Sequence, residues 1–294
     1  MHGLGIDPCL FGMLDPCSGR STRDRQHVLC PIYSNQRNDN NDNNSKLAIL
    51  HISSTPTYEA FLSCLDTMAS QPTNNIHISA HPCLRAKLSQ LRSASTNAPD
   101  TKRLVHDIST IIACEALGDT LSTVETGIDE SPLGYQYTTE SISPSNISIV
   151  PILRSGLSMV DAVQTLLPSP VAVHHLGMYR DKATLSAVEY YNNLPQHSAT
   201  DAAGQMDIAI IVDPIVATGS TLCAAIETLK DWGAPRIFCF VVLATEGGLK
   251  RAAEVWPEGV DIWVGGVDPE TDEKGMIKPG LGDIGDRLFM TVGK

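Results

Sequence analysis

Apolar residues follow two different patterns along the chain, and the change comes near residue 147. Before this point, leucines recur at helical spacing in residues 84–91, and a longer apolar face runs through residues 104–117. This spacing predicts two packed amphipathic helices. Further upstream, Leu47–Ile52 is compatible with a short strand and Glu59–Met68 with a helix.

From residue 147 onward, short apolar runs alternate with amphipathic stretches. The runs predict strands over residues 147–152, 171–178, 208–212, 238–243 and 260–264, and the stretches predict helices over 157–167, 220–232 and 246–255. Strands that are apolar throughout are buried on both faces, so this alternation predicts an α/β fold with a mostly parallel sheet flanked by helices. Ligands of such sheets bind beyond the carboxyl ends of the strands. That edge would hold Arg154, Arg180 and Asp213.

One predicted strand ends in Asp213, and a loop of small and hydroxyl residues then opens the next predicted helix. Backbone N–H groups at a helix N-terminus carry a partial positive charge and bind phosphate. Gly219 would let the backbone approach a ligand closely. The hydroxyls of Thr218, Ser220 and Thr221 would add donors. A plain Ser or Thr N-cap is the ordinary alternative for such a string, but the order of strand, acid and helix favours a phosphate loop.

The composition narrows the classes of partner. The net charge of −12 over 294 residues repels phosphate backbones, so we expect no nucleic-acid partner. The longest clean apolar run, Ile237–Ala244, is too short to cross a bilayer, and the N-terminus lacks a secretory pattern, so we expect a cytoplasmic protein without membrane contact. The eight cysteines show no CxxC pair or zinc-finger spacing, and Cys223 and Cys239 lie in apolar patterns that favour reduced core thiols.

Residues 1–45 differ from the rest of the chain. They hold scattered Cys, Pro and Gly, followed by the polar run Asn38–Asn44. Such a tract buries too little apolar surface to offset the entropy of the chain. We therefore predict a disordered N-terminal extension over residues 1–45 and one folded domain over residues 46–294.

Four ordered segments resemble those of uracil phosphoribosyltransferases, which belong to the type I phosphoribosyltransferases and use phosphoribosyl pyrophosphate (PRPP). The central one, Ile210–Thr221, resembles their PRPP motif, with Asp-Pro in place of two acids. The others are Val150–Leu157, similar to the pyrophosphate loop, Gly177–Pro195, similar to the second arginine and mobile loop, and Lys278–Phe289, similar to the uracil-binding segment. With residues 81–116, which resemble the family's helical region, the likeness covers roughly residues 77–294.

This resemblance implies a type I phosphoribosyltransferase-like fold with an N-terminal helical region and a small C-terminal base-binding segment. It implies a phosphoribosyltransferase domain over residues 46–294 that transfers the 5-phosphoribosyl group from PRPP to uracil, giving UMP and pyrophosphate in pyrimidine salvage. The expected cofactor is Mg²⁺, carried by PRPP, with no residue assigned as a direct metal ligand. The expected partners are uracil, PRPP and further copies of the chain in a homo-oligomer.

The family's site residues carry over to matching positions. Arg154 would hold the pyrophosphate and, with Asp213, would be catalytic. The PRPP-binding residues would be Arg154, Arg180, Asp213, Pro214, Ile215, Val216, Ala217, Thr218, Gly219, Ser220, Thr221 and Asp283. The uracil-binding residues, acting mostly through their backbone, would be Ile277, Gly282, Asp283 and Ile284. His174 and His175 are interpreted as structural residues inside a strand.

The chain departs from the family pattern at several positions. Ser155 replaces a usual Ala and Ser220 a usual second Gly, while Met276, Lys278 and Ile284 stand where other residues are common. Two alternatives to a uracil phosphoribosyltransferase therefore stay open. One is a phosphoribosyltransferase for another base, and the other is a catalytically weak or silent regulatory homologue that binds PRPP or uracil.

Overall fold

The computed structural model describes residues 75–181, 187–195 and 206–291, apart from the side chain of Arg180. The extension expected over residues 1–45 and the elements expected in residues 47–68 lie outside these ranges. The strands are β1 (Ile76–Ile78), β2 (Ser122–Glu130), β3 (Gln136–Ser143), β4 (Ile147–Leu153), β5 (Ala172–Val173), β6 (Leu176–Arg180), β7 (Ala187–Asn192), β8 (Ile208–Val212), β9 (Ile215–Val216), β10 (Ile237–Val241), β11 (Leu243–Thr245), β12 (Val260–Val264), β13 (Val267–Asp268), β14 (Glu270–Thr271) and β15 (Ile277–Lys278). The helices are α2 (Pro82–Arg92), α3 (Ala98–Thr120), α4 (Leu157–Gln164), α5 (Ser220–Trp232), α6 (Glu246–Val255) and α7 (Ile284–Phe289).

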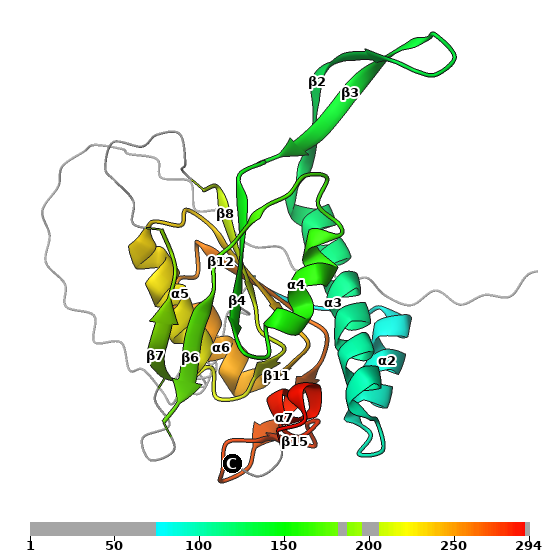
Figure 1. Ribbon diagram of the computed structural model, residues 1–294. Helices are drawn as coiled ribbons and strands as arrows, with labels where there is room; N and C mark the ends of the chain where they lie inside the picture. The colour runs from blue at the N-terminus through cyan, green and yellow to red at the C-terminus, as the bar shows by residue number, and fades with distance from the viewer. Residues whose placement is uncertain (1–74, 182–186, 196–205, 292–294) are drawn as a thin grey trace, which may run out of the picture. The chain divides into compact units, whose positions relative to one another are not determined.

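A mostly parallel eight-stranded sheet forms the centre of the fold (Figure 1). Its strand order is β1-β12-β10-β8-β4-β6-β7, with β5 also paired to β4. The described pairs are parallel except for β7, which runs antiparallel to β6 at one edge. Every residue of β8 and β10 is buried, as the continuous apolar runs predict. The expected α/β fold is therefore confirmed.

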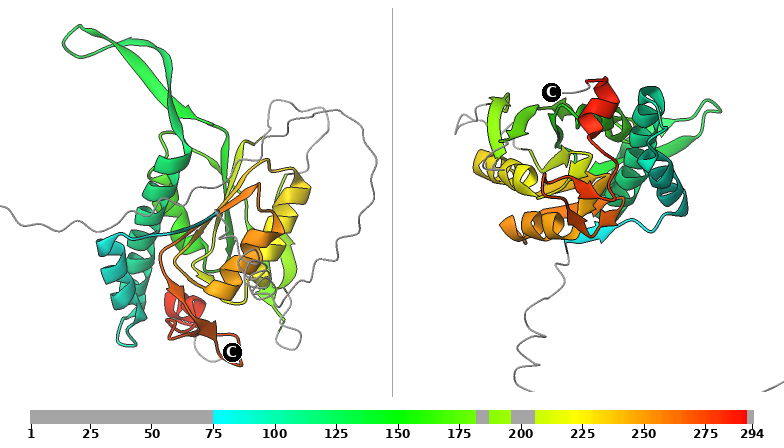
Figure 2. Two further views of the ribbon diagram at one scale, coloured as in Figure 1. Left: turned by 180° about the vertical axis from the view of Figure 1, so that it is seen from behind. Right: turned by 90° about the horizontal axis from the view of Figure 1, so that it is seen from below.

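Helices cover both faces of this sheet (Figure 2). Along β8, Ile208, Ile210 and Val212 join a core that also contains buried side chains of α2, α3 and α4. Ala209 and Ile211 point the opposite way, into a core shared with α5 and α6. Since successive side chains of a strand face opposite sides, a strand buried on both faces needs apolar residues at every position.

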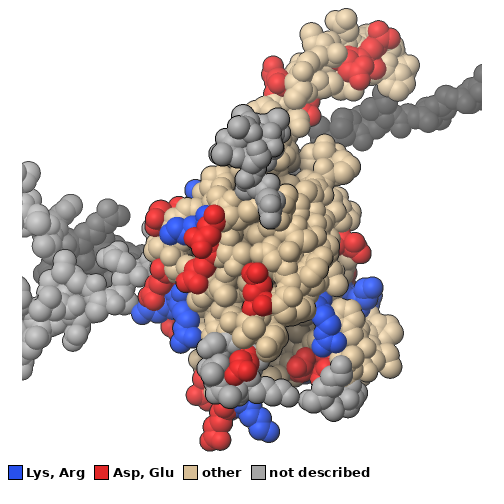
Figure 3. All heavy atoms as spheres, turned by 60° about the vertical axis from the view of Figure 1, so that its left-hand side comes forward, with Lys and Arg blue, Asp and Glu red and all other residues tan. Residues whose placement is uncertain are grey.

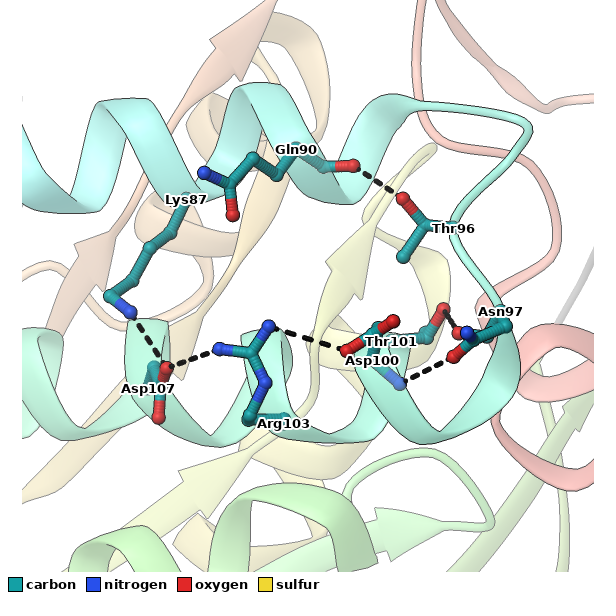
Figure 4. Close-up of polar contacts among 8 residues, drawn as sticks. All are labelled: Lys87, Gln90, Thr96, Asn97, Asp100, Thr101, Arg103 and Asp107. Atoms are coloured by element: carbon teal, nitrogen blue, oxygen red, sulfur yellow. Dashed lines mark hydrogen bonds and ion pairs between the residues drawn. The ribbon is translucent and has the colours of Figure 1, made fainter.

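Polar contacts join α2 and α3 into a helical pair (Figure 4). Asn97 caps α3 by accepting the Asp100 N–H at 2.8 Å. Lys87 of α2 pairs with Asp107 of α3 at 2.7 Å, and Arg103 adds exposed ion pairs along α3. The Lys87–Asp107 contact is half-buried between the two helices, while leucines at helical spacing form the apolar side of the pair. The N-terminal helical region expected from the sequence is therefore present.

A β2–β3 hairpin extends away from the sheet and helices (Figure 1). Every residue of β2 is exposed, and the hairpin carries acidic residues but no Lys or Arg, as Figure 3 shows. Side chains that face solvent on both sides leave no alternation to detect, so the apolar pattern did not predict this hairpin.

No helix among the described residues is long and apolar enough to span a membrane.

Two strands expected from the sequence are divided in the structure. The run over residues 171–178 breaks between β5 and β6, so the prediction that His174 and His175 lie inside a strand is wrong. At the break, the His175 N–H is donated to the side chain of Asn193, while the His174 N–H still bonds to the backbone oxygen of Ile149 in β4. The run over residues 238–243 likewise divides between β10 and β11. Within the expected mobile loop, residues 187–192 form β7, and residues 182–186 lie outside the described ranges.

Candidate functional site

Two loops meet where β4 and β8 end. The strands pair in parallel, with Pro151 opposite Val212, so Arg154 and Asp213 follow neighbouring strand ends. The peptide bond between Leu153 and Arg154 is cis. A Cβ atom on Gly156 would lie 2.3 Å from the backbone oxygen of Val212. The two loops therefore approach so closely that only glycine fits at position 156.

A cavity of about 190 Å³ lies beside these loops. One side is formed by Asp213 and the small-residue loop, which we define as residues 213–219, together with the start of α5. The other side is formed by residues 275–277 and 281–284 of the C-terminal segment, defined here as residues 275–289. The cavity thus brings together residues that the sequence assigns to PRPP and to uracil. These shared residues are Asp213, Ile215, Val216, Ala217, Thr218, Gly219, Ser220, Thr221, Ile277, Gly282, Asp283 and Ile284.

Asp213 is the buried acid of this cavity, with 7% of its surface exposed. Burial raises the pKa of its carboxyl group to about 7, because removal from water disfavours the charged form. The backbone N–H of Ile215 and the hydroxyl of Ser155, which donates across 3.4 Å, partly oppose this rise. Near neutral pH, this carboxyl group is therefore easier to protonate than an exposed aspartate.

The small-residue loop leads directly into α5. The N-cap of this helix is Gly219, with φ of 82° and no side-chain capping bond, so the alternative of a Ser or Thr N-cap is wrong. A Cβ atom on Gly219 would lie 2.6 Å from the backbone oxygen of Gly248, which explains the need for glycine. The Thr218 and Ser220 hydroxyls lie 3.1 Å apart at the helix start. Uncapped N–H groups and neighbouring hydroxyls at a helix N-terminus suit a phosphate group.

Thr245, which the sequence analysis did not single out, supports this loop from behind. It is the N-cap of α6 and accepts the Gly248 N–H at 3.0 Å. Its hydroxyl also donates to the backbone oxygen of Ala217 at 2.6 Å. Thr245 thereby ties the small-residue loop to a second helix. The sequence signal that could have identified Thr245 is its position between an apolar strand and a helix.

Arg154 is exposed and is not part of the cavity lining. Its guanidinium group lies 5.8 Å from the centre of the Phe289 ring, over α7. A Cβ atom on Gly285 would lie 3.8 Å from Nη2 of Arg154 and 3.2 Å from a carboxylate oxygen of Asp283. The guanidinium group and the Asp283 carboxylate therefore both lie close to Gly285.

Asp283 has a local structural task as well as its place in the cavity lining. One of its carboxylate oxygens accepts the Asp286 N–H at 3.0 Å and so caps α7. The side chain is exposed, which leaves the second oxygen able to contact a ligand. Pro214 is buried but does not line the cavity, and Arg180 ends β6 with a side chain outside the description.

The cavity wall formed by the C-terminal segment is partly apolar. Ile277 and Ile284 are both buried, with 9% and 6% of their surfaces exposed, and Leu243 and Leu281 also contribute. Glycines at positions 280 and 282 have φ of 59° and 77°, in the left-handed region that favours glycine. A flat, partly apolar ligand suits these walls, with polar edges met by backbone groups. Among the described residues, no group of three or more His, Cys, Asp or Glu could hold a metal ion.

Comparisons with known proteins identify the family of the chain. A family model described as uracil phosphoribosyltransferase matches residues 78–291. The uracil phosphoribosyltransferase of Roseiflexus castenholzii is 41% identical over 216 residues, which cover 74% of this chain and 98% of that protein. That of Staphylococcus aureus is 37% identical over 218 residues, covering 74% and 99%. Among solved structures, the AQ2163 protein from Aquifex aeolicus has a TM-score of 0.65 and 32% identity, covering 73% of this chain and 97% of its own.

Proposed function

The chain belongs to the uracil phosphoribosyltransferase family, and we propose that its cavity joins uracil to the ribose of PRPP. The enzyme is a pentosyltransferase that releases pyrophosphate and yields UMP. One observation carries the assignment of the site. Most of the residues that the sequence assigns to PRPP, and all of those that it assigns to uracil, line the same cavity, although the small-residue loop and the C-terminal segment lie about 60 residues apart in the chain.

The small-residue loop would hold the 5′-phosphate and ribose of PRPP. The N-terminus of α5 offers backbone N–H groups, and the hydroxyls of Thr218, Ser220 and Thr221 add further donors. Val216 and Ala217 shape the loop, and Thr245 keeps it in place. Because these donors are held before substrate arrives, little ordering is needed on binding.

Asp213 would bind the ribose hydroxyls. Its carboxylate can accept two hydrogen bonds, and its negative charge would stabilise positive charge that develops on the sugar as pyrophosphate departs. A buried carboxylate exerts a stronger effect on that charge than an exposed one, since water screens it less. Binding of a partner with hydroxyl donors also favours the ionised form and so lowers the pKa of Asp213 on binding.

Arg154, Arg180 and Asp283 would act on the pyrophosphate side. Arg154 is exposed next to the C-terminal segment, so its planar guanidinium group is free to pair with phosphate oxygens. A charged donor on departing pyrophosphate lowers the barrier by stabilising the leaving group. Arg180 lies at the end of β6, on the same sheet edge.

Uracil would lie between the small-residue loop and the C-terminal segment. Backbone groups of Ile277, Gly282 and Ile284 would meet its polar edge, and the buried isoleucine side chains would contact its faces. Backbone N–H and C=O groups can recognise a pyrimidine without an ionisable side chain, so no side-chain base is required. Hydrogen bonds to fixed groups also explain how one base is preferred, because a base with the wrong edge leaves these groups unpaired.

Phosphoribosyltransferases generally use Mg²⁺ with PRPP, and the residues present fit this role through the substrate. The free oxygen of Asp283 is the kind of hard ligand that Mg²⁺ prefers, and pyrophosphate oxygens would supply others. Bound Mg²⁺ would neutralise charge on the pyrophosphate group. We further propose that the chain acts as a homo-oligomer in the cytoplasm and has no nucleic-acid partner, in line with its net charge of −12.

A direct test uses purified protein with PRPP, Mg²⁺ and one nucleobase at a time. We expect the protein to form UMP from uracil, and chromatography detects this product. Turnover of another base without UMP would reassign the substrate. Binding of PRPP without turnover of any base would instead identify a silent homologue.

A further inference from the structure

The part of the chain proposed to read uracil has little regular structure of its own. Between β14 and α7, only the two residues of β15 are in a strand, and the turn that follows contains Gly280 and Gly282 at positive φ. In the turn of residues 279–282, the Gly280 N–H and the oxygens of Gly280 and Leu281 bond to side chains outside the turn, so the turn does not fix the direction of its own N–H groups. Its geometry must come from contacts with the rest of the fold.

Arg92, the last residue of α2, provides one of these contacts. Its guanidinium group pairs with both carboxylate oxygens of Asp268, at 2.6 and 2.7 Å, and it donates to the backbone oxygen of Gly280 at 2.8 Å. Asp268 is buried and accepts the Gly280 N–H at 2.9 Å. Arg92 and Asp268 together therefore hold both backbone polar groups of Gly280.

Arg287 of α7 provides the second contact. It donates to the backbone oxygen of Leu281 at 2.8 Å, and also to those of Leu91 and Ser93 at 2.6 and 3.1 Å. Leu91 lies in the last turn of α2, where backbone oxygens lack partners within the helix. Arg287 satisfies one of them and thereby fastens the C-terminal segment to the end of α2.

Peptide geometry links these bonds to the cavity. In a trans peptide, the C=O of one residue and the N–H of the next point in opposite directions within one plane. The bonds from Gly280 to Leu281 and from Leu281 to Gly282 are not among the cis peptides. Since Arg287 holds the Leu281 oxygen on the α2 side, the Gly282 N–H must point the other way. Gly282 lines the cavity, and α2 does not.

We propose that Arg287 is a positioning residue for base recognition, which directs the Gly282 N–H toward the uracil subsite by holding the oxygen of Leu281. Arg92 does the same for the Leu281 N–H by holding the oxygen of Gly280. This inference rests on the proposed function. It adds a specificity element that does not touch the substrate and that acts through Gly282, which is assigned to uracil, while the loop that would hold the 5′-phosphate and ribose lies on the opposite side of the cavity.

Arginine is required at position 287 because three backbone oxygens must be held at once. Its guanidinium group has five donors in a fixed fork, whereas the single nitrogen of lysine cannot reach all three oxygens. Lysine keeps the charge and at least one bond, and methionine keeps the length and packing but removes every donor. A graded series of Arg287, Arg287→Lys and Arg287→Met therefore tests the role.

The experiment measures the KM values for uracil and for PRPP in turn, with the other substrate saturating, alongside the melting temperature of each variant. Arg287→Met is expected to raise the KM for uracil about tenfold and to leave the KM for PRPP within about twofold. Arg287→Lys should fall between the wild type and Arg287→Met. Lys87→Met is the matched control, because it removes a clamp between α2 and α3 (Figure 4) without touching the C-terminal segment. It should leave both KM values unchanged.

An unchanged KM for uracil in Arg287→Met would overturn the inference, and so would equal rises in both KM values or the same split in Lys87→Met. If Arg287→Met does not fold, Arg287→Lys decides by the same comparison. Wild-type protein that makes no UMP would overturn the proposed function and this inference with it. Wild-type UMP formation with unchanged variants would overturn the inference alone.

Discussion

Replacing Asp213 by asparagine separates the chemical role of this carboxylate from its cost to the fold. Burial raises the pKa of Asp213 from 3.8 to about 7. Between these two values, the folded protein keeps a proton that the unfolded chain has already released. Stability therefore falls as pH rises through this range, and the full cost is present above pH 7. A rise of about three pKa units corresponds to about 4 kcal/mol, at about 1.4 kcal/mol per unit.

An asparagine at position 213 is neutral at every pH and avoids this cost. Its NH₂ group replaces one acceptor and must face the Ile215 N–H or the Ser155 hydroxyl, which costs about 1–3 kcal/mol. The net gain at pH 8 is then about 1–3 kcal/mol, and near pH 5 it is close to zero. With about 2–4 °C per kcal/mol for a chain of this size, Asp213→Asn should melt several degrees higher than the wild type at pH 8.

Turnover should move in the opposite direction. Loss of the charge that stabilises the developing positive sugar should lower kcat about 100-fold, a typical loss for one electrostatic group. The assay combines thermal melting at pH 5 and pH 8 with UMP formation on the same preparation. Near-normal turnover, together with earlier melting at pH 8, would show that Asp213 is a structural acid, and the site would have been assigned wrongly.

Three further predictions concern the PRPP side of the site and the N-terminal extension. Arg154→Ala should raise the KM for PRPP at least about tenfold, since charged hydrogen bonds to phosphate contribute about 1.5–3 kcal/mol. Its melting temperature should barely move because Arg154 is exposed, and Arg103→Ala, which removes only exposed ion pairs on α3, serves as the control. Thr245→Val keeps the shape of the side chain but leaves the Ala217 oxygen unpaired. The KM for PRPP should therefore rise by about threefold to tenfold, while the KM for uracil stays constant. An equal change in both KM values would argue against a role of Thr245 in the small-residue loop. Deletion of residues 1–45 should leave turnover nearly intact, because the family match begins at residue 78, and a large loss in a truncated protein that still folds would place the extension in the catalytic unit.

The elements that the sequence predicted best are those whose ends are marked by a change of residue type. β8 ends where the apolar run meets Asp213, and α5 lies between Gly219 and Gly233, whose φ values of 82° and 98° suit glycine. Local composition determines such boundaries, so they can be inferred without a structure. The small-residue loop was predictable for the same reason, whereas the cavity residues of the C-terminal segment were identified only through the resemblance to uracil phosphoribosyltransferases.

The remaining features depend on contacts between distant parts of the chain. The β2–β3 hairpin has no buried face and therefore no apolar alternation to detect. Arg92 and Asp268 lie 176 residues apart, and neither position shows by itself that the other is its partner. Thr245 looked like an ordinary residue between a strand and a helix until its bond to Ala217 was seen. Residues such as Arg92, Asp268 and Thr245 support the site without lining the cavity. The sequence around each of them does not reveal its partner.

UMP formation from uracil and PRPP would show directly that the chain is an active uracil phosphoribosyltransferase. Purified protein is incubated with PRPP, Mg²⁺ and each nucleobase in separate reactions, and the products are separated by chromatography. We expect UMP and pyrophosphate with uracil, and about 100-fold slower formation of both when Asp213→Asn replaces the wild type. Absence of UMP from folded wild-type protein, with turnover of a different base, would contradict this expectation.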